Sequence, residues 1–436
     1  MTNIFKAYDI RGIYGENIDK DVAYKLGRSF VIFLKKRKPR IVIGRDYRIS
    51  SPELFNYLRK GIMDQGGIVL DIGLSTTPMQ YFATCFLKGD GGVMITASHN
   101  PKEYNGFKIV AKNASPIGEE SGLKELKQVY DNLNDDLGRG GELIKKNISK
   151  DYIKYIVEDF KLKDFDFKIG IDTANSVSGI LIDKIFSKTK CKIYHINKEL
   201  DSGFKSHDPD PLLKKNLKQL VDLIKEKKLD LGIAFDGDGD RIVFLDENAE
   251  VISSDIVLAL LGDVLGKTVL YDLRCSNIIP EIVGEKAYKS RIGHSFIKKT
   301  MKEENIYIGG EYSGHFYLNK KYCFEAPFFV LFNLLEQMKL SSKKISEIVK
   351  PYKKYYHSGE INFKVENKDK IIKEIEKKYK DGKKIKIDGL RIDFNDFWFL
   401  VRASNTEPVL RLIIEAKNKE ILKEKENQLK QIIIDN

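Results

Sequence analysis

The chain has 436 residues, of which 42% are hydrophobic and 11% aromatic, and this is enough apolar material for a packed core in each of several domains. Its formal net charge is +12, but lysines alternate with glutamates in segments such as 370–386, which favours solvated helix faces over a nucleic-acid-binding surface. The four cysteines are widely spaced and form no Cys-x-x-Cys pair, so the sequence indicates neither a disulfide framework nor a zinc site.

The sequence also argues against a membrane protein. Residues 1–12 contain an aspartate and no apolar signal core, and no stretch approaches the roughly 18 uncharged apolar residues of a membrane span. We therefore expect a cytoplasmic protein with no membrane or nucleic-acid partner. The positive charge would also attract a small anionic substrate over a long range.

Three segments repeat one pattern, in which an apolar strand is followed by Asp-x-x-x-Ser and then by a helix. The first helix has Ser51 and Pro52 near its predicted start and two glycines at its end. The pattern predicts three related α/β domains, and the alternative is that the three segments match by chance. The strands and the segments that follow them are 40–43 with 46–50, 167–171 with 172–176, and 268–271 with 272–276.

Each of the three units contains a later apolar strand that ends in an unusual loop. The strand at 93–95 precedes Ser98, the strand at 231–235 precedes Asp236, and the strand at 306–308 precedes Glu311. Open α/β sheets bind ligands at the carboxyl ends of their strands. The three loops are therefore expected to form one composite site where the domains meet.

The last part of the chain differs in character from the three repeated units. Predicted strands at 359–365 and 384–394 flank a helix rich in lysine and glutamate, which indicates a smaller α+β domain. From composition, linkers are expected at 138–141 and 350–358, with a further boundary near 246–253. The resulting domains are 1–148, 149–248, 249–352 and 353–436.

Asp236, Asp238 and Asp240 alternate with glycines directly after a predicted strand. The glycines let the backbone curl so that the three carboxylates converge on one hard cation such as Mg²⁺. An EF-hand is an alternative because Glu247 falls at the twelfth loop position, but Arg241 takes the place of the usual glycine and a strand precedes the loop. A plain acidic turn is the other alternative, although such closely spaced carboxylates repel one another without a cation.

Ser98 follows a predicted strand and is surrounded by cationic residues. A serine in such a loop is often only a turn or cap residue. His99 and Lys108 lie close in the sequence, however, and a serine that carries phosphate requires positive partners for nearly two added negative charges. The pattern favours a phosphorylated serine.

Two further loops carry residues suited to a sugar phosphate. Glu311 and Ser313 offer acceptors and donors for sugar hydroxyls, with a plain turn as the alternative. The segment 402–408 places an arginine beside short polar side chains, as in a phosphate cradle, with a structural capping loop as the alternative. Weaker candidates for substrate binding are Arg274, His294 and Lys298, and each of them could instead have a purely structural role.

Taken in order, five motifs resemble those of the α-D-phosphohexomutase superfamily, and the resemblance spans essentially the whole chain. It implies an α/β fold with a heart-shaped, four-domain architecture, in which three related α/β domains precede a C-terminal α+β domain. The motifs are 8–12, 96–101, 236–241, 311–315 and 402–408.

The resemblance also implies a role for each matching residue. Ser98 would be the phosphoserine and would hold Mg²⁺ together with the three aspartates, while Arg241 positions the reacting phosphate. Among the flanking residues His99, Lys108 and His315, the last two are favoured for proton transfer. The residues implied or inferred to bind substrate are Tyr8, Arg11, Arg274, His294, Lys298, Glu311, Ser313, Arg402, Ser404, Asn405, Thr406 and Arg411.

The implied reaction moves phosphate between O1 and O6 of a hexose through a hexose 1,6-bisphosphate, which also serves as activator. Within the superfamily the chain looks most like the phosphomannomutase/phosphoglucomutase branch, because phosphoglucosamine mutases usually have glutamine at position 312 and glycine at position 405. Here these residues are Tyr312 and Asn405, although the dual-specificity enzymes commonly have methionine at 312. Arg274 stands where the family normally has lysine.

The alternatives are a phosphoglucosamine mutase, a sugar-phosphate-binding protein without turnover, and a nucleic-acid-binding protein. The intact serine, aspartates and Lys108 argue against binding alone, since binding would not require the full set. We expect the enzyme to be a monomer or a homodimer.

Overall fold

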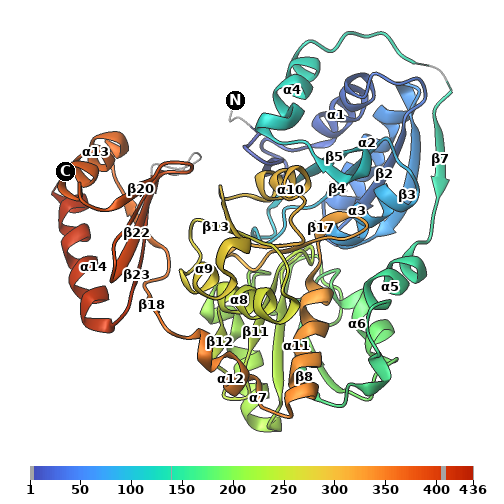
Figure 1. The fold of residues 1–436 in the computed structure, drawn as a ribbon. Coiled ribbons are helices and arrows are strands. Elements are labelled where there is room, and N and C mark those ends of the chain that lie inside the picture. The colour runs from blue at the N-terminus through green and yellow to red at the C-terminus, as the bar shows by residue number, and fades with distance from the viewer. Residues whose placement is uncertain (1–3, 139, 404–408, 436) are drawn as a thin grey trace.

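Three α/β units follow one another along the chain, and a smaller unit at the C-terminus is set apart from them (Figure 1). The computed structural model describes residues 4–138, 140–403 and 409–435. No helix in these ranges is long and apolar enough to cross a bilayer.

The first unit is built on the sheet β1-β5-β4-β2-β3-β7, with β6 paired to β5. Its strands are β1 (Ile10–Ile13), β2 (Arg40–Arg45), β3 (Ile68–Leu74), β4 (Gly91–Ile95), β5 (Tyr104–Ala111), β6 (Ser115–Pro116) and β7 (Glu142–Lys145). Its helices are α1 (Lys20–Phe33), α2 (Ser51–Asp64), α3 (Thr77–Phe86) and α4 (Lys124–Asp131), with short helical turns η1 (Lys112–Ala114) and η2 (Glu119–Leu123).

The second unit has the sheet β12-β11-β10-β8-β9. Its strands are β8 (Lys168–Asp172), β9 (Lys192–Ile196), β10 (Leu231–Phe235), β11 (Ile242–Leu245) and β12 (Val251–Ile252). Its helices are α5 (Ser149–Val157), α6 (Gly179–Phe186) and α7 (Lys218–Lys227), with turns η3 (Leu162–Asp164) and η4 (Lys214–Leu217).

The third unit has the sheet β14-β13-β15-β16-β17. Its strands are β13 (Val269–Asp272), β14 (Ala287–Ser290), β15 (Ile308–Gly310), β16 (Phe316–Asn319) and β17 (Cys323–Glu325). Its helices are α8 (Ser254–Leu265), α9 (Ile278–Val283), α10 (His294–Glu303), α11 (Pro327–Ser341) and α12 (Ile345–Val349), with turns η5 (Gly284–Lys286) and η6 (Lys350–Tyr352).

The C-terminal unit is an antiparallel sheet, β18-β23-β22-β21-β20, with β19 also paired to β23. Its strands are β18 (Tyr356–His357), β19 (Ile361–Lys364), β20 (Lys383–Ile385), β21 (Leu390–Asp393), β22 (Phe397–Ala403) and β23 (Val409–Ala416), and its helices are α13 (Lys368–Lys378) and α14 (Lys419–Ile434). The predicted strand at 384–394 is in fact the hairpin β20-β21, which turns at Gly389 with a φ of +81°.

The first three sheets share one topology. In each, a first strand pairs in parallel with a later one, as β2 does with β4, β8 with β10 and β13 with β15. The later strand then pairs antiparallel with the next strand, β5, β11 or β16. The loops that follow β4, β10 and β15 therefore occupy equivalent positions, and the predicted set of three related α/β domains is confirmed.

The repeated aspartate has a local structural cause. Asp46, Asp172 and Asp272 each end or follow the first strand of the parallel pair, and each carboxylate accepts the backbone N–H two residues later. These distances are 3.0, 2.9 and 2.7 Å. Such a bond lets an aspartate fix a turn by hydrogen bonding to its own backbone.

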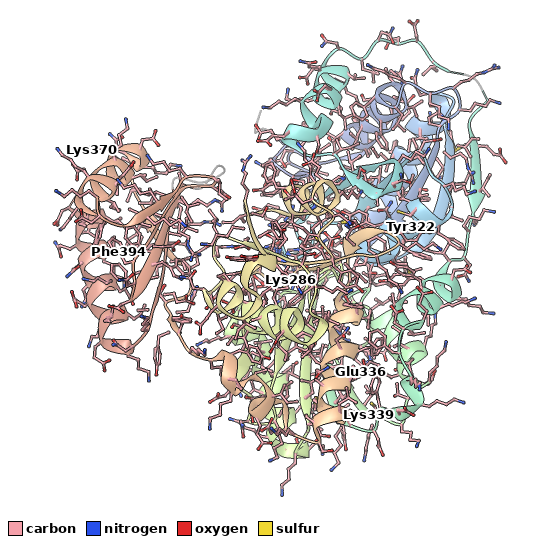
Figure 2. The ribbon with its side chains drawn as sticks, in the orientation of Figure 1. Lys286, Tyr322, Glu336, Lys339, Lys370 and Phe394 are labelled. Carbon is pink, nitrogen blue, oxygen red and sulfur yellow. The ribbon has the colours of Figure 1, made fainter. Side chains whose placement is uncertain are left out.

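One apolar cluster spans the first three units, with members from Val42 to Tyr352, and further clusters lie within the individual units. At its edge the rings of Phe82 on α3, Tyr155 on α5 and Tyr322 beside β17 pack with centroids 5.1 to 6.1 Å apart, and Figure 2 labels Tyr322. The C-terminal unit has a separate core, and a small cluster joins it to the third unit. That cluster consists of Leu273, Ile292, Trp398, Leu400 and Ile413.

Two predicted linkers lie inside sheets or directly beside them. β7 pairs with β3, so the segment 138–141 precedes a strand of the first sheet instead of separating two domains. β12 pairs with β11, so the second sheet extends past residue 248, where the sequence placed the end of the second domain. The four domain ranges otherwise stay a prediction.

Candidate active site

A cleft of about 590 Å³ opens where the loops after β4, β10 and β15 converge. The structure brings most of the predicted residues to its wall, and the three aspartates lie buried beneath it. The predicted residues that line the cleft are Tyr8, Arg11, Ser98, His99, Lys108, Arg241, Arg274, His294, Glu311, Ser313, His315 and Arg411.

Ser98 stands at the junction of the first and second units. Its backbone is left-handed, with a φ of 51°, and its N–H donates to the Thr96 hydroxyl at 2.9 Å. Its Oγ donates to Oδ2 of Asp236 at 2.8 Å, and Nδ1 of His99 is 3.4 Å from the same Oγ. The hydroxyl is thus directed toward the aspartate loop at the edge of the cleft.

The aspartate loop has the composition and burial of a metal site. Asp236, Asp238 and Asp240 each offer a carboxylate oxygen, and these atoms lie within 4.8 Å of one another. All three side chains are almost fully buried, and Oδ1 of Asp238 has no hydrogen-bond partner among the described residues. A buried carboxylate oxygen without a donor is costly, so the three residues fit a hard divalent cation such as Mg²⁺.

The electrostatics of the loop support the same conclusion. Burial, together with the charges of Asp240 and Asp238, raises the pKa of Asp236 well above its usual value. Burial also opposes the ionisation of Asp240, but Lys108 and His315 outweigh it and hold the Asp240 pKa well below the usual range. A site that concentrates negative charge in this way gains most from a bound cation.

Lys108 is the cation nearest to the aspartates. Its Nζ donates to Oδ2 of Asp238 at 2.7 Å and to Oδ2 of Asp240 at 2.5 Å. Burial alone would lower the pKa of Lys108, but the two carboxylates raise it well above its usual value. The ammonium therefore ties β5 of the first unit to the loop after β10.

Arg48 is a site residue that the sequence interpretation missed. Its guanidinium is fully buried and donates to the carbonyls of Ser98 at 2.8 Å, Asn100 at 2.7 Å and Pro101 at 2.7 Å. Arg48 thus fixes the backbone of the serine loop. A signal was present in the sequence, because Arg48 lies inside the first Asp-x-x-x-Ser unit, but its position there does not reveal its partners.

Gly237 is needed where the serine loop and the aspartate loop meet. A Cβ atom at this position would lie 2.3 Å from the carbonyl oxygen of Ser98 and 3.3 Å from the Pro209 ring. The carbonyl cannot retreat freely, because Arg48 binds it.

We expect Gly237→Ala to lower kcat by about 10²-fold, because the added Cβ must displace the loop that carries Ser98 by a large fraction of an ångström. Steady-state rates on a hexose phosphate measure the effect. Gly203→Ala is the matched control, because its added Cβ meets only ordinary contacts and should leave kcat within about twofold. A Gly237→Ala enzyme with unchanged kcat would contradict the steric argument.

Glu311 makes hydrogen bonds and an ion pair with several residues of the third unit at the cleft. Its carboxylate accepts hydrogen bonds from the Tyr317 hydroxyl at 2.5 Å and the Gly293 N–H at 3.1 Å. Arg274 lies against the same group, with Nη2 3.4 Å from Oε2 of Glu311 and 2.6 Å from Oδ2 of Asp272. Ser313 Oγ is 3.0 Å from Nδ1 of His315.

The second and third units interlock beside the aspartates. Arg241 and His315 form an isolated antiparallel bridge, and the Ile242 N–H donates to the Gly314 carbonyl at 3.0 Å. This places Nε2 of His315 3.3 Å from Oδ1 of Asp240. The bridge therefore holds a metal-loop carboxylate and a predicted proton-transfer residue side by side.

The two other histidines of the cleft favour their neutral forms. Burial, reinforced by the charges of Arg241 and Arg11, holds the pKa of His99 well below its usual value. Burial and the charge of Lys298 do the same for the pKa of His294. Neutral imidazoles can accept hydrogen bonds as well as donate them.

Tyr8 and Arg11 lie where the first and third units face each other across the cleft. The Tyr8 hydroxyl donates to the Ile292 carbonyl at 3.0 Å, and a Cβ at Gly293 would collide with the Tyr8 ring. Arg11 pairs with Asp9 and donates to the Asn100 side chain at 2.5 Å. Both side chains are thus held in place by hydrogen bonds at the wall of the cleft.

Several predicted substrate residues are not on the wall of the cleft. Lys298 is fully buried, its ammonium donates to Glu325 at 2.9 Å, and it lies over the Tyr81 ring. Arg402 donates from Nε to Asp388 at 2.9 Å. Ser404, Asn405 and Thr406 lie outside the described residues.

Family comparisons agree with this arrangement in all four parts of the chain. Residues 2–136, 150–249 and 253–355 match the models for α/β/α domains I, II and III of phosphoglucomutase/phosphomannomutase, and residues 360–431 match the C-terminal domain. The chain belongs to the phosphoglucomutase/phosphomannomutase family.

Relatives match this family member over nearly their full length. A phosphomannomutase of Methanocaldococcus jannaschii is 40% identical, with 99% of this chain and 97% of that protein covered. A phosphomannomutase/phosphoglucomutase of Pseudomonas aeruginosa is 34% identical, with 96% and 93% covered. A phosphoglucomutase/phosphomannomutase family protein of Burkholderia thailandensis superposes with a TM-score of 0.90 at 30% identity, covering 99% of this chain and 97% of that one.

Membership of the phosphoglucomutase/phosphomannomutase family confirms the resemblance, the fold class and the assignment to the phosphohexomutase enzymes. The roles of individual residues stay predictions.

Proposed function

We propose that the enzyme is a phosphomannomutase/phosphoglucomutase that interconverts hexose 1-phosphates and hexose 6-phosphates. The proposal rests on the family and on one contact, the 2.8 Å hydrogen bond from the Ser98 hydroxyl to Asp236. This contact puts a hydroxyl able to carry phosphate directly against three carboxylates suited to a cation. A binding protein would have no use for that juxtaposition.

Mg²⁺ is the proposed cofactor, and the side chains of Asp236, Asp238 and Asp240 together with the Ser98 oxygen would hold it. When bound, it would neutralise charge on the phosphoryl group that is transferred. The remaining catalytic work is assigned to side chains of the cleft.

In the first half of the proposed reaction, phosphorylated Ser98 transfers its phosphoryl group to the free hydroxyl of the substrate. The bond from phosphorus to Oγ breaks as the bond from phosphorus to the sugar oxygen forms, and the hydroxyl proton passes to a base. Lys108 and His315 are the proposed proton-transfer residues, since both line the cleft and contact Asp240. His315 is proposed as the base that takes the hydroxyl proton, and the Lys108 ammonium, which two carboxylates stabilise, as the donor of a proton to the Ser98 oxygen that is released. Arg241 and His99 face the same region and can bind phosphate oxygens.

The product of the first half is a hexose 1,6-bisphosphate. It reverses its orientation in the cleft and returns its other phosphate to Ser98. Glu311 and Ser313 are proposed to hold sugar hydroxyls in both orientations, with Arg274 and His294 beside them. The residues proposed to close the entrance of the cleft are Tyr8 and Arg11, and those proposed to bind the non-reacting phosphate are Arg402, Ser404, Asn405, Thr406 and Arg411. Because Ser98 must be phosphorylated at the start of each cycle, added hexose 1,6-bisphosphate should activate the enzyme.

Initial rates with three substrates test the proposal. Glucose 1-phosphate, mannose 1-phosphate and glucosamine 1-phosphate are each supplied with Mg²⁺ and a catalytic amount of hexose 1,6-bisphosphate. We expect turnover of the first two. Turnover of glucosamine 1-phosphate alone would transfer the assignment to phosphoglucosamine mutase, and no turnover of any would contradict the proposed activity.

A further inference from the structure

Three consecutive backbone carbonyls of the third unit are bound by side chains of the C-terminal unit. Arg391 Nη1 donates to the carbonyls of Leu273 at 2.7 Å and Cys275 at 3.2 Å. His357 Nε2 lies 3.2 Å from the carbonyl of the residue between them, Arg274. We call residues 273–277 the Arg274 loop.

The donors are held in place by their own surroundings. The Arg391 guanidinium is fully buried, lies 3.6 Å from the centre of the Trp398 ring and donates from Nε to Asp393 at 2.8 Å. The N–H of Gly359 donates to Nδ1 of His357 at 2.9 Å, so the hydrogen of this imidazole lies on Nε2, facing the carbonyl. Both side chains are thus oriented before they meet the loop.

Two further contacts close the same loop. Nη2 of Arg391 donates to the Asn277 side chain at 2.5 Å, and the Asn277 N–H donates to Glu415 of β23 at 2.9 Å. The carbonyls of residues 273–275 and the N–H and side chain of Asn277 therefore all bond to the C-terminal unit, which an interface formed only by apolar packing would not require.

The loop carries one of the cleft residues. The Arg274 side chain forks onto Asp272, reaches Glu311 at 3.4 Å and approaches the Ser313 hydroxyl at 3.5 Å. These are the residues proposed to hold the sugar. Because an arginine fork depends on its backbone position for two-point contacts, a shift of the loop would misplace it.

We propose that Arg391 and His357 are positioning residues of the C-terminal unit that hold the Arg274 loop, and through it the Arg274 guanidinium, in place against the sugar site. The inference rests on the proposed function for the role of Arg274. The position of the C-terminal unit therefore helps to set the position of the Arg274 guanidinium in the sugar site, although neither Arg391 nor His357 lines the cleft.

A double-mutant cycle tests the inference. Arg391→Lys keeps the charge but has a single nitrogen, which cannot bind the two carbonyls, the Asn277 side chain and Asp393 at once as Nη1, Nη2 and Nε of the arginine do. We expect it to lower kcat/KM for glucose 1-phosphate by about tenfold. In an Arg274→Met background the same change should cost less than about twofold, because the residue through which it acts is gone. His357→Phe, which keeps a ring against Tyr312 but removes the donor, should show the same coupling.

Lys289→Met is the matched control, because Lys289 crosses the same interface to Asp393 at 3.3 Å without touching the Arg274 loop. We expect it to change kcat/KM by less than about twofold in either background. Amide hydrogen exchange of residues 273–277 gives a readout that does not depend on turnover. It should accelerate in Arg391→Lys and in His357→Phe, and stay unchanged in Lys289→Met.

The inference would be overturned if Arg391→Lys lowered kcat/KM equally in the wild-type and Arg274→Met backgrounds. It would also be overturned if the amides of residues 273–277 exchanged no faster in Arg391→Lys than in Lys289→Met. Either result would leave the proposed function standing. If the wild-type enzyme converted no hexose phosphate, the proposed function would fail, and the exchange experiment would still decide whether Arg391 and His357 hold the loop.

Discussion

Ser98→Ala is expected to lower mutase turnover by more than about 10³-fold, because it removes the oxygen proposed to give and take the phosphoryl group. The loss should persist when hexose 1,6-bisphosphate is supplied, since a bisphosphate cannot restore an acceptor that is absent. Phosphorylation measured by intact-protein mass spectrometry after incubation with the bisphosphate should add one phosphate to the wild-type chain and none to the variant.

Ser178→Ala is the matched control for this experiment. Ser178 is also buried and donates to the backbone carbonyl of Asp236 at 3.2 Å, but it does not line the cleft. The Ser176 hydroxyl donates to the same carbonyl, so the acceptor keeps a partner when Ser178 is changed. A Ser98→Ala enzyme that retained wild-type rates would refute the phosphoserine mechanism.

Removal of the metal is the second large effect that the structure predicts. A chelator should lower activity by more than about 10²-fold, and added Mg²⁺ should restore it. Binding to the folded state alone should also raise the thermal midpoint by roughly 5 °C at saturating Mg²⁺. Asp238→Asn should abolish both responses, because it replaces a buried ligand whose Oδ1 is available to a cation.

Asp222→Asn serves as the control for the metal experiment. Asp222 lies on α7 of the same unit, its side chain is 61% exposed, and it pairs with Lys218 on the surface. This variant should keep the wild-type response of both rate and thermal midpoint to Mg²⁺. An equal Mg²⁺-dependent rise in Asp238→Asn would show that the cation binds elsewhere.

Local sequence patterns were enough to predict the fold class and the convergence of three loops. The aspartate repeat carried this information because each carboxylate fixes a turn within two residues, a constraint that acts entirely along the chain. The strand before Asp236 was predicted with its observed ends, since β10 is fully buried and therefore apolar throughout.

Features that depend on distant partners were not predicted. The buried ion pair between Lys298 and Glu325 brings α10 against β17, and the sequence, which indicated Lys298 only as a weaker substrate candidate, does not reveal this partner. Arg48 and Arg391 bind backbone carbonyls, which every residue possesses, so no sequence pattern marks their targets. β7 and β12 are short edge strands whose pairing partners decide their domain, and composition alone placed boundaries beside them.

The apolar cluster that spans the first three units restricts movement between the parts of the site that they carry. Ser98, the aspartate loop and Glu311 are attached to one close-packed body, and interiors of this kind resist sliding. The side chains proposed to donate phosphate, to bind the cation and to hold the sugar therefore form a fixed frame. The half-turn between the two proposed transfers must then be made by the bisphosphate itself within this frame, and the C-terminal unit, which has its own core, meets the frame through the Arg274 loop and a small apolar cluster.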